Sequence, residues 1–241
     1  MSGIYQSQPA IEPHVYDHDI IDVETWKRKP NFDFYKDKPS PLWGVTVRLD
    51  VTKARRVCQE HAWKYLQASL FLMALAVNET EAMQLRMRDE IAKDGATKTT
   101  VIRHHRVHPS CPIMREDETY GFCVFESNAN NSFTSFREYA QRALEDFHSA
   151  SSGMNKSPRD DILHGSVLPW IDFLSYEHAT GSRPDIPKYV FGKIVHNAAN
   201  DTWSQSFCIH THHSLADGLH VGQFLDRFQK NLDKAEQLLM T

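Results

Sequence analysis

Histidines able to act on a proton cluster near the C-terminus of this chain. They lie in the run 206–220, SFCIHTHHSLADGLH. Because side chains alternate between the two faces of a strand, His213 shares an apolar face with Phe207 and Ile209, whereas His210 and His212 share the other. A histidine at the end of a rigid strand, just before an Asp-Gly turn, can reach into a cleft. Its neutral ring then suits proton abstraction near neutral pH.

Spacing alone leaves three roles open for these histidines. His213 can be a general base, or it can be a hydrogen-bonded histidine of the core. A metal ion could instead be held by ligands drawn from His210, His212, His213, Asp217 and His220. Strand parity weakens this cluster because it places His213 on the face opposite His210 and His212, although His212 and His220 could still meet. A covalent nucleophile is not favoured, because the chain has no Gly-x-Ser-x-Gly elbow and no cysteine in a Cys/His signature. A histidine acting directly on an incoming hydroxyl fits acyl transfer in a ternary complex.

The elements that must position this run alternate between strands and helices. Expected strands cover residues 45–50, 99–107, 112–115, 121–125, 165–173, 188–196 and 205–213. Expected helices cover two stretches between 52 and about 94, then 133–148 and 219–239. No internal repeat or shift in composition divides the chain. We therefore expect a flexible arm over residues 1–20 and a single mixed α/β domain over residues 21–241.

Composition argues against several classes of protein. The net charge is −4, and Lys and Arg are scattered among acidic residues, so no nucleic-acid partner is expected. The longest apolar run, residues 66–77, is too short to span a membrane and predicts a buried helix. The N-terminus lacks a signal-peptide pattern, which predicts a cytoplasmic location. The four cysteines include no C-x-x-C pair and are expected to be free and buried: Cys58, Cys111, Cys123 and Cys208.

Three separated motifs resemble the chloramphenicol acetyltransferase family. The pattern H-H-x-x-x-D-G at residues 212–218 resembles that family's active-site segment, and related forms occur in dihydrolipoyl acyltransferases, plant acyltransferases and peptide-synthetase condensation domains. Residues 26–35, WKRKPNFDFY, resemble its W-x-R-K-x-x-F-x-F-Y stretch, and residues 166–170, SVLPW, resemble its S-A-L-P-W segment. The resemblance implies a two-layer α/β sandwich with a mixed β-sheet. It also implies an acetyl-CoA-dependent O-acetyltransferase that acts in antibiotic resistance.

The resemblance assigns catalytic roles to four residues. His213 is the implied general base, and the hydroxyl of Ser166 is the implied donor to the oxyanion of the tetrahedral intermediate. Asp217 is implied to form a buried bidentate ion pair with Arg28. That pair orders the active-site loop and does not relay protons.

The resemblance also implies a small-molecule site shared between subunits. Phe34, Tyr35, Tyr120 and His164 are the implied acceptor-pocket residues, and Trp170 and Lys193 lie near the coenzyme A tunnel. Acetyl-CoA is a co-substrate, and no permanently bound cofactor or metal is implied. The family assembles as a homotrimer, so His213 is expected to act on a substrate bound partly by the neighbour's Phe34, Tyr35 and Ser166.

The acceptor side departs from the family pattern. Val190 stands where threonine is common, His164 stands where asparagine is usual, and residues 175–187 form a more polar segment. We expect chloramphenicol as the acceptor, with a different hydroxylated small molecule as the alternative. Two hypotheses of another class remain: a histidine-rich metal-binding protein and a non-catalytic ligand-binding protein.

Overall fold

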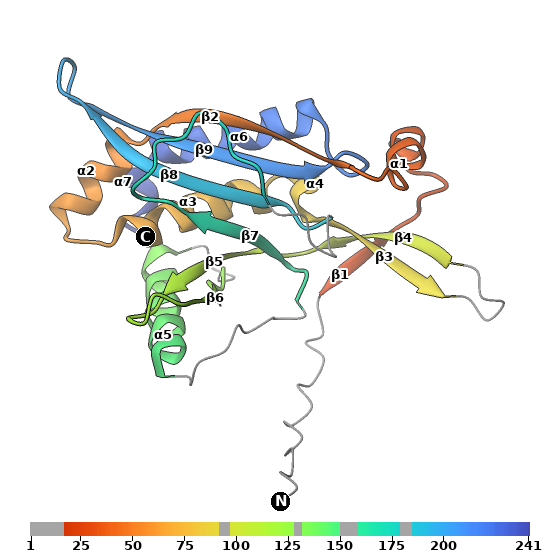
Figure 1. Ribbon diagram of the computed structural model, residues 1–241, viewed down its shortest axis with the longest axis horizontal. Helices are drawn as coiled ribbons and strands as arrows, with labels where there is room; N and C mark the ends of the chain where they lie inside the picture. The colour runs from red at the N-terminus through yellow and green to blue at the C-terminus, as the bar shows by residue number, and fades with distance from the viewer. Residues whose placement is uncertain (1–16, 92–96, 128–131, 150–158, 179–184) are drawn as a thin grey trace, which may run out of the picture.

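Two sheets organise the protein. The computed structural model describes residues 17–91, 97–127, 132–149, 159–178 and 185–241 (Figure 1). The large sheet has the order β2-β9-β8-β7-β5-β6, and the small sheet has the order β1-β4-β3. The large sheet consists of β2 (Leu42–Asp50), β5 (His108–Met114), β6 (Tyr120–Val124), β7 (Ile162–Val167), β8 (Lys188–Asn197) and β9 (Thr202–His212). The small sheet consists of β1 (His18–Ile21), β3 (Leu85–Ile91) and β4 (Thr97–His104). The pairs β5·β7 and β7·β8 are parallel and the other pairs are antiparallel, so the large sheet is mixed.

Helices form the second layer. They are α1 (Lys29–Tyr35), α2 (Thr52–Glu60), α3 (Tyr65–Asn78), α4 (Glu81–Gln84), α5 (Phe133–Ser149), α6 (Gly218–Asp233) and α7 (Ala235–Leu238). Figure 1 shows α2, α3 and α6 behind the large sheet, with α5 beside β5 and β6 and with α1 apart, near the small sheet. This arrangement confirms the two-layer α/β sandwich with a mixed sheet.

The apolar faces of the strands and helices meet in one main core. Phe191 of β8, Phe207 of β9 and Phe228 of α6 contact one another through their rings, and Phe224 joins them. All four are buried, and full burial of such a ring stabilises the fold by roughly 2–3 kcal/mol. Since β9 and α6 are both anchored here, the core fixes the two ends of the turn 213–217 that connects them.

The apolar run 66–77 forms most of α3, as predicted, and ten residues of that helix are buried. Within the described residues, no helix is long and apolar enough to cross a membrane. The four cysteines are free and buried, which confirms the expectation for them.

Several expected boundaries were wrong; the strand expected over residues 165–173, for example, ends at Val167. Residues Leu85–Ile91 form strand β3 and not the end of a helix, because alternate residues such as Leu85 face a small core while Arg86 faces the opposite side. The expected continuation to about residue 94 lies outside the described residues. The C-terminal helix is broken at Lys234 into α6 and α7. At the other end, His18–Ile21 form β1 and pair with β4, so the last part of the expected arm belongs to the fold, and residues 1–16 lie outside the described part.

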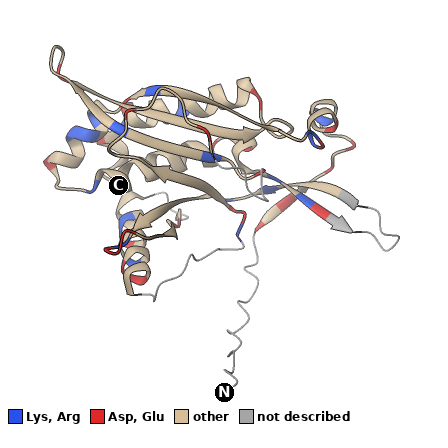
Figure 2. Ribbon diagram, viewed as in Figure 1, with Lys and Arg blue, Asp and Glu red and all other residues tan. Residues whose placement is uncertain are grey.

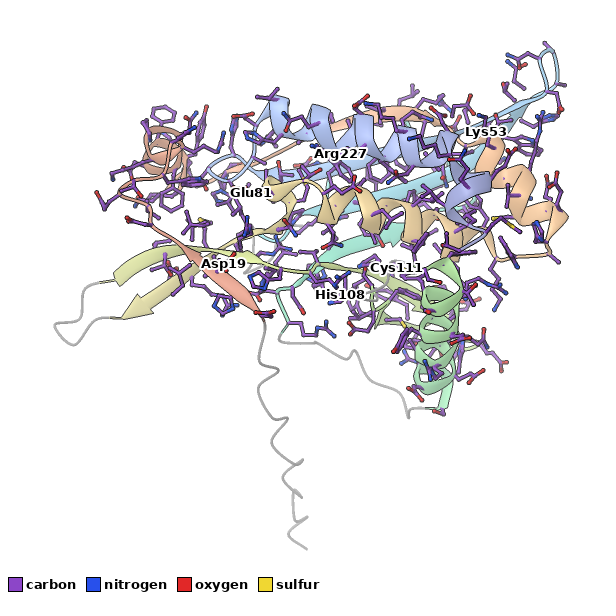
Figure 3. All side chains as sticks on the ribbon, turned by 180° about the vertical axis from the view of Figure 1, so that it is seen from behind. Asp19, Lys53, Glu81, His108, Cys111 and Arg227 are labelled. Carbon is purple, nitrogen blue, oxygen red and sulfur yellow. The ribbon has the colours of Figure 1, made fainter. Side chains whose placement is uncertain are left out.

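The small sheet supports the C-terminal turn. Leu85 and Val101 pack with Phe32 of α1 and with Leu215, which lies in the turn after β9. Asp19 of β1, labelled in Figure 3, forms an ion pair with Arg103 of β4. Basic and acidic segments lie side by side on these strands and on α5 (Figure 2). The small sheet thus links α1 to the turn.

A buried arginine fastens the small sheet to the large one. The Arg86 guanidinium is fully buried and donates to the backbone oxygens of Asp160 at 2.6 Å and Ile162 at 2.8 Å, at the start of β7. It also donates to the carbonyls of Met83 and Leu85. Each of these carbonyls would lose a partner without the guanidinium, and a buried polar group without a partner is costly.

We predict that Arg86→Met lowers the free energy of unfolding by about 3–5 kcal/mol, because it leaves several buried carbonyls without donors. Urea unfolding at one fixed protein concentration measures this change. The control is Arg56→Met, which removes the exposed ion pair with Asp201 and should cost no more than about 1 kcal/mol. Equal effects of the two substitutions would contradict this account of Arg86.

Candidate active site

His213 lies one residue beyond β9, at the start of the turn that leads to α6. Its backbone N–H donates to the carbonyl of Pro41 at 2.9 Å, so pairing with the β2 side continues just past the strand. The imidazole is half-buried and stacks on the ring of Tyr35, with centroids 4.0 Å apart and an interplanar angle of 0°. The ring of Trp43 approaches the same imidazole at 5.3 Å and 35°. Aromatic rings therefore hold the candidate base, and no carboxylate contacts it within the described residues.

Asp217 joins three separate parts of the chain. Its side chain caps α6 by accepting a hydrogen bond from the N–H of Leu219 at 3.1 Å, and it contacts His220 Nδ1 at 2.7 Å. The other carboxylate oxygen accepts from Arg28 Nη1 at 2.7 Å. Desolvation alone would raise the pKa of Asp217, but the hydrogen bonds from Arg28 and His220 outweigh it and lower that pKa to about 2. The carboxylate is therefore ionised at neutral pH.

The ion pair exists, but the expected bidentate geometry was wrong. A single Arg28 nitrogen contacts Asp217, and Nε and Nη2 of Arg28 are buried without hydrogen-bond partners among the described residues. The reason is that the second oxygen of Asp217 is occupied by His220 and by the start of α6. Arg28 also precedes α1, whose last residue is Tyr35. The ion pair thus fixes the start of the helix whose end stacks on His213.

His212 occupies a different environment from His213. It is buried, and its Nδ1 lies 2.7 Å from the hydroxyl of Ser214. Desolvation lowers the pKa of His212 to about 4. His212, His220 and Asp217 do not come together as metal ligands: no group of three or more His, Cys, Asp or Glu in the described part of the chain is placed to hold a metal ion.

Ser166 lies on β7, near the middle of the large sheet. In the strand register it is opposite Val190 of β8, which is opposite Cys208 of β9. The preceding residue, Gly165, is packed so closely that an added Cβ would lie 2.1 Å from the ring of Tyr189. That contact leaves no room for a side chain at residue 165 and fixes the position of Ser166.

His213 and Ser166 of one chain lie far apart. Two strand spacings separate Ser166 from Cys208, and five residues separate Cys208 from His213. At ~4.8 Å per strand and ~3.3 Å per residue, the Cα atoms of His213 and Ser166 are roughly 19 Å apart. No hydroxyl that contacts His213 can therefore also react next to the Ser166 of the same chain.

The four candidate residues of the acceptor pocket lie in two separate regions, one near His213 and one near Ser166. The ring of Phe34 contacts that of Tyr35 at 4.8 Å, and Tyr35 in turn stacks on His213. Their placement corrects the expectation that the neighbour supplies Tyr35, because this ring stacks on the histidine of its own chain. Tyr120 and His164 lie instead on either side of Phe122, at 6.0 and 6.3 Å, on the β6 side of the sheet.

The Ser166 side of the sheet also carries a row of basic residues. His164, Lys188 and His210 are register partners across β7, β8 and β9, two register positions from Ser166 and on the same face of the sheet. The ring of His178 contacts that of His210 at 5.4 Å. Desolvation, reinforced by nearby positive charges, lowers the pKa of His178 to about 4. His164 and His210 were named from the sequence, but their juxtaposition with Lys188 and His178 was not, because it depends on strand register and on the contact between the rings of His178 and His210.

Of the two candidate coenzyme A residues, Trp170 lies in the loop that follows β7 and Lys193 lies on β8. Trp170 is exposed over 65% of its surface, and Lys193 is also exposed. The backbone N–H of Lys193 donates to the carbonyl of Ile171 at 2.8 Å, which brings the two side chains to one edge of the Ser166 region. Trp170 and Lys193 therefore lie on the Ser166 side and not beside His213.

Comparison with known proteins decides the family. The model of the family described as chloramphenicol acetyltransferase matches residues 16–229. The chain belongs to the chloramphenicol acetyltransferase family. As a member of this family, the protein is an acetyltransferase.

Individual relatives match over most of the chain. Chloramphenicol acetyltransferase 3 of Escherichia coli is 22% identical over 214 residues, which cover 87% of this chain and 94% of that relative. A chloramphenicol acetyltransferase of Staphylococcus aureus is 25% identical over 214 residues, covering 87% of this chain and 96% of that relative. These identities are low, but coverage of both chains is high.

Solved structures show the same fold. A chloramphenicol acetyltransferase structure has a TM-score of 0.76 and 21% identity, and the match covers 89% of this chain and 99% of that chain. A probable dihydrolipoamide acetyltransferase from Listeria monocytogenes has a TM-score of 0.60 and 17% identity, covering 86% and 90%. The fold expected from the family resemblance is confirmed.

His212 makes stability depend on pH. Its pKa falls from 6.5 to about 4 on folding, so below pH 6.5 the unfolded chain binds a proton that the folded chain does not bind until about pH 4. Stability should therefore fall as the pH drops through this window, by on the order of 2–3 kcal/mol from this residue. Urea unfolding between pH 7.5 and pH 4 measures this change. The free energy of unfolding of His212→Asn should vary less with pH than that of the wild-type protein. His148→Asn, at the exposed end of α5, serves as the control and should keep the wild-type slope. Identical slopes for all three proteins would contradict the prediction.

Proposed function

We propose that this protein transfers the acetyl group of acetyl-CoA to a hydroxyl of chloramphenicol, with His213 as the general base. The observation that carries the proposal is the placement of His213. It is half-buried, stacked on Tyr35 and contacted by the tilted ring of Trp43, at the start of a turn whose last residue, Asp217, pairs with Arg28. The named relatives support chloramphenicol as the acceptor, since both are chloramphenicol acetyltransferases.

The reaction needs no covalent bond to the protein. The neutral imidazole of His213 takes the hydroxyl proton as the acceptor oxygen attacks the thioester carbonyl. The tetrahedral oxyanion accepts a hydrogen bond from the Ser166 hydroxyl. Collapse of this intermediate breaks the carbon–sulfur bond, and the departing thiolate takes the proton from the imidazolium. The products are the acetyl ester and free coenzyme A.

The surroundings of His213 suit an imidazole that becomes positively charged during the reaction. The faces of Tyr35 and Trp43 attract a cation placed against them, and such contacts contribute about 0.5–2 kcal/mol. The Arg28–Asp217 ion pair positions α1 and the turn, and takes no part in proton transfer. Phe34 and Tyr35 would contact the acceptor on this side, and Tyr120 and His164 would contact it from the Ser166 side.

We infer that each active site is completed by a second subunit of a homotrimer. The separation of roughly 19 Å between His213 and Ser166 supports this assembly, because the general base and the oxyanion donor must both reach one tetrahedral carbon. Trp170 and Lys193 lie with Ser166, so coenzyme A would approach from the subunit that supplies Ser166. The same proposal places the protein in the cytoplasm, with antibiotic resistance as its role and with no bound cofactor or metal.

A different hydroxylated small molecule is the second candidate acceptor. The row His164, Lys188 and His210 favours it, because these basic residues lie near Ser166 and would contact an acceptor more polar than an aromatic amide alcohol. Thiol release with chloramphenicol separates the two candidates. Release only with another hydroxyl compound, still dependent on His213, would favour the second.

Substitution of the proposed base provides the first test. We predict that His213→Ala loses at least three powers of ten in the turnover number for thiol release from acetyl-CoA plus chloramphenicol, because nothing else accepts the hydroxyl proton. Thermal unfolding should remain cooperative, and His148→Ala should keep full activity. Turnover by His213→Ala at the wild-type rate would refute the assignment of the base, and a wild-type protein that releases no thiol with any hydroxyl compound would indicate a non-catalytic binding protein.

Mixing two inactive subunits tests the shared site. Coexpression of His213→Ala chains with Ser166→Ala chains should restore about a quarter of wild-type activity, because that fraction of interfaces combines an intact His213 with an intact Ser166. Each variant expressed alone is the control. Activity that stays at the level of the separate variants, although mixed oligomers form, would show that one chain supplies both residues.

A further inference from the structure

Trp43 contacts both the ring of His213 and the turn that carries it. Its indole approaches the imidazole at 5.3 Å, and its Nε1–H donates to the carbonyl of Ala216 at 3.0 Å. We infer that Trp43 is a positioning residue for the general base, which sets the orientation of the His213 ring and the conformation of the turn 213–217. This inference rests on the proposed role of His213 in acyl transfer.

The His213 ring has little else to orient it. Its Nδ1 atom is buried without a hydrogen-bond partner among the described residues, and no carboxylate contacts it there. The parallel stack on Tyr35 restrains tilting of the imidazole but does not prevent the ring from sliding within its own plane. Tyr35 lies parallel to the imidazole at 4.0 Å, whereas the indole of Trp43 meets it at 5.3 Å and 35°, so the two rings contact it with different geometries. The tilted indole therefore restrains the movement that the Tyr35 stack leaves free.

Trp43 itself is held firmly. It lies on β2, opposite Thr211 of β9 in the strand register, so it is fixed to the strand that leads to the base. Pro41, two residues earlier, accepts the hydrogen bond from the backbone N–H of His213. The start of β2 thus holds the turn at its first residue through Pro41 and at Ala216 through Trp43.

The hydrogen bond to Ala216 acts next to Asp217. The N–H groups of Leu215 and Ala216 both donate to the carbonyl of His212, which gives the turn its tight form. The indole then holds the Ala216 carbonyl, and Arg28 holds the carboxylate of the following residue. Contacts from Pro41, Trp43 and Arg28 thus hold the turn 213–217, and through it they set how His213 is presented to an incoming hydroxyl.

Two variants separate the functions of the indole. Trp43→Phe keeps an aromatic ring but removes the N–H donor, and we expect the turnover number to fall roughly tenfold. Trp43→Leu removes both contacts, and we expect a fall of roughly a hundredfold, the scale that a misplacement of about 1 Å produces. The KM for acetyl-CoA should change less than about threefold, because coenzyme A approaches from the Ser166 side. Trp203→Phe, at the far end of β9, is the matched control and should keep wild-type turnover.

A readout independent of activity keeps this inference separate from the proposed reaction. In NMR spectra the imidazole signals of His213, assigned by their absence in His213→Asn, should broaden or shift in Trp43→Phe and remain unchanged in Trp203→Phe. If the wild-type protein transfers no acetyl group, the proposed function fails while this measurement still decides the role of Trp43. Unchanged His213 signals and unchanged turnover in Trp43→Phe would overturn the inference. Lower turnover with unchanged signals would overturn it as well, since the ring would then not depend on Trp43.

Discussion

The carboxylate of Asp217 is the constraint on which the rest of the site depends. One oxygen caps α6 and contacts His220, and the other accepts from Arg28 at the start of α1. Because α1 ends at Tyr35, the same ion pair places the ring that stacks on His213. The pKa of Asp217, lowered to about 2, keeps the carboxylate charged over the pH range in which a histidine can act as a base.

The second constraint is the geometry of the sheet. Strand spacing separates His213 from the Ser166 of its own chain by roughly 19 Å, so a site that needs both residues must combine two chains. The candidate residues divide accordingly: Phe34, Tyr35 and His213 lie at one side, whereas Ser166 and His164 lie at the other. If the site is shared as proposed, a substitution on the Ser166 side can alter contacts to the acceptor without altering how His213 is held.

Much of this site could be predicted from the sequence, because its main residues lie in three local motifs. The alternation through β9 correctly separated His213 from the buried His212. The sequence could not show that Asp217 binds Arg28 through one nitrogen, since His220 and α6 compete for the carboxylate only in the folded chain. Trp43 was missed for a similar reason: it is distant in sequence from His213 and meets it only through the pairing of β2 with β9. The β3 strand was mistaken for helix because its alternation is short and charged.

In the proposed reaction His213 acts directly on the acceptor, and no acetyl group passes through the protein. Initial rates measured while acetyl-CoA and chloramphenicol are varied together test it most directly. For direct transfer we expect double-reciprocal lines that intersect, and no gain in protein mass after incubation with acetyl-CoA alone. Parallel lines together with an acetylated protein would contradict it.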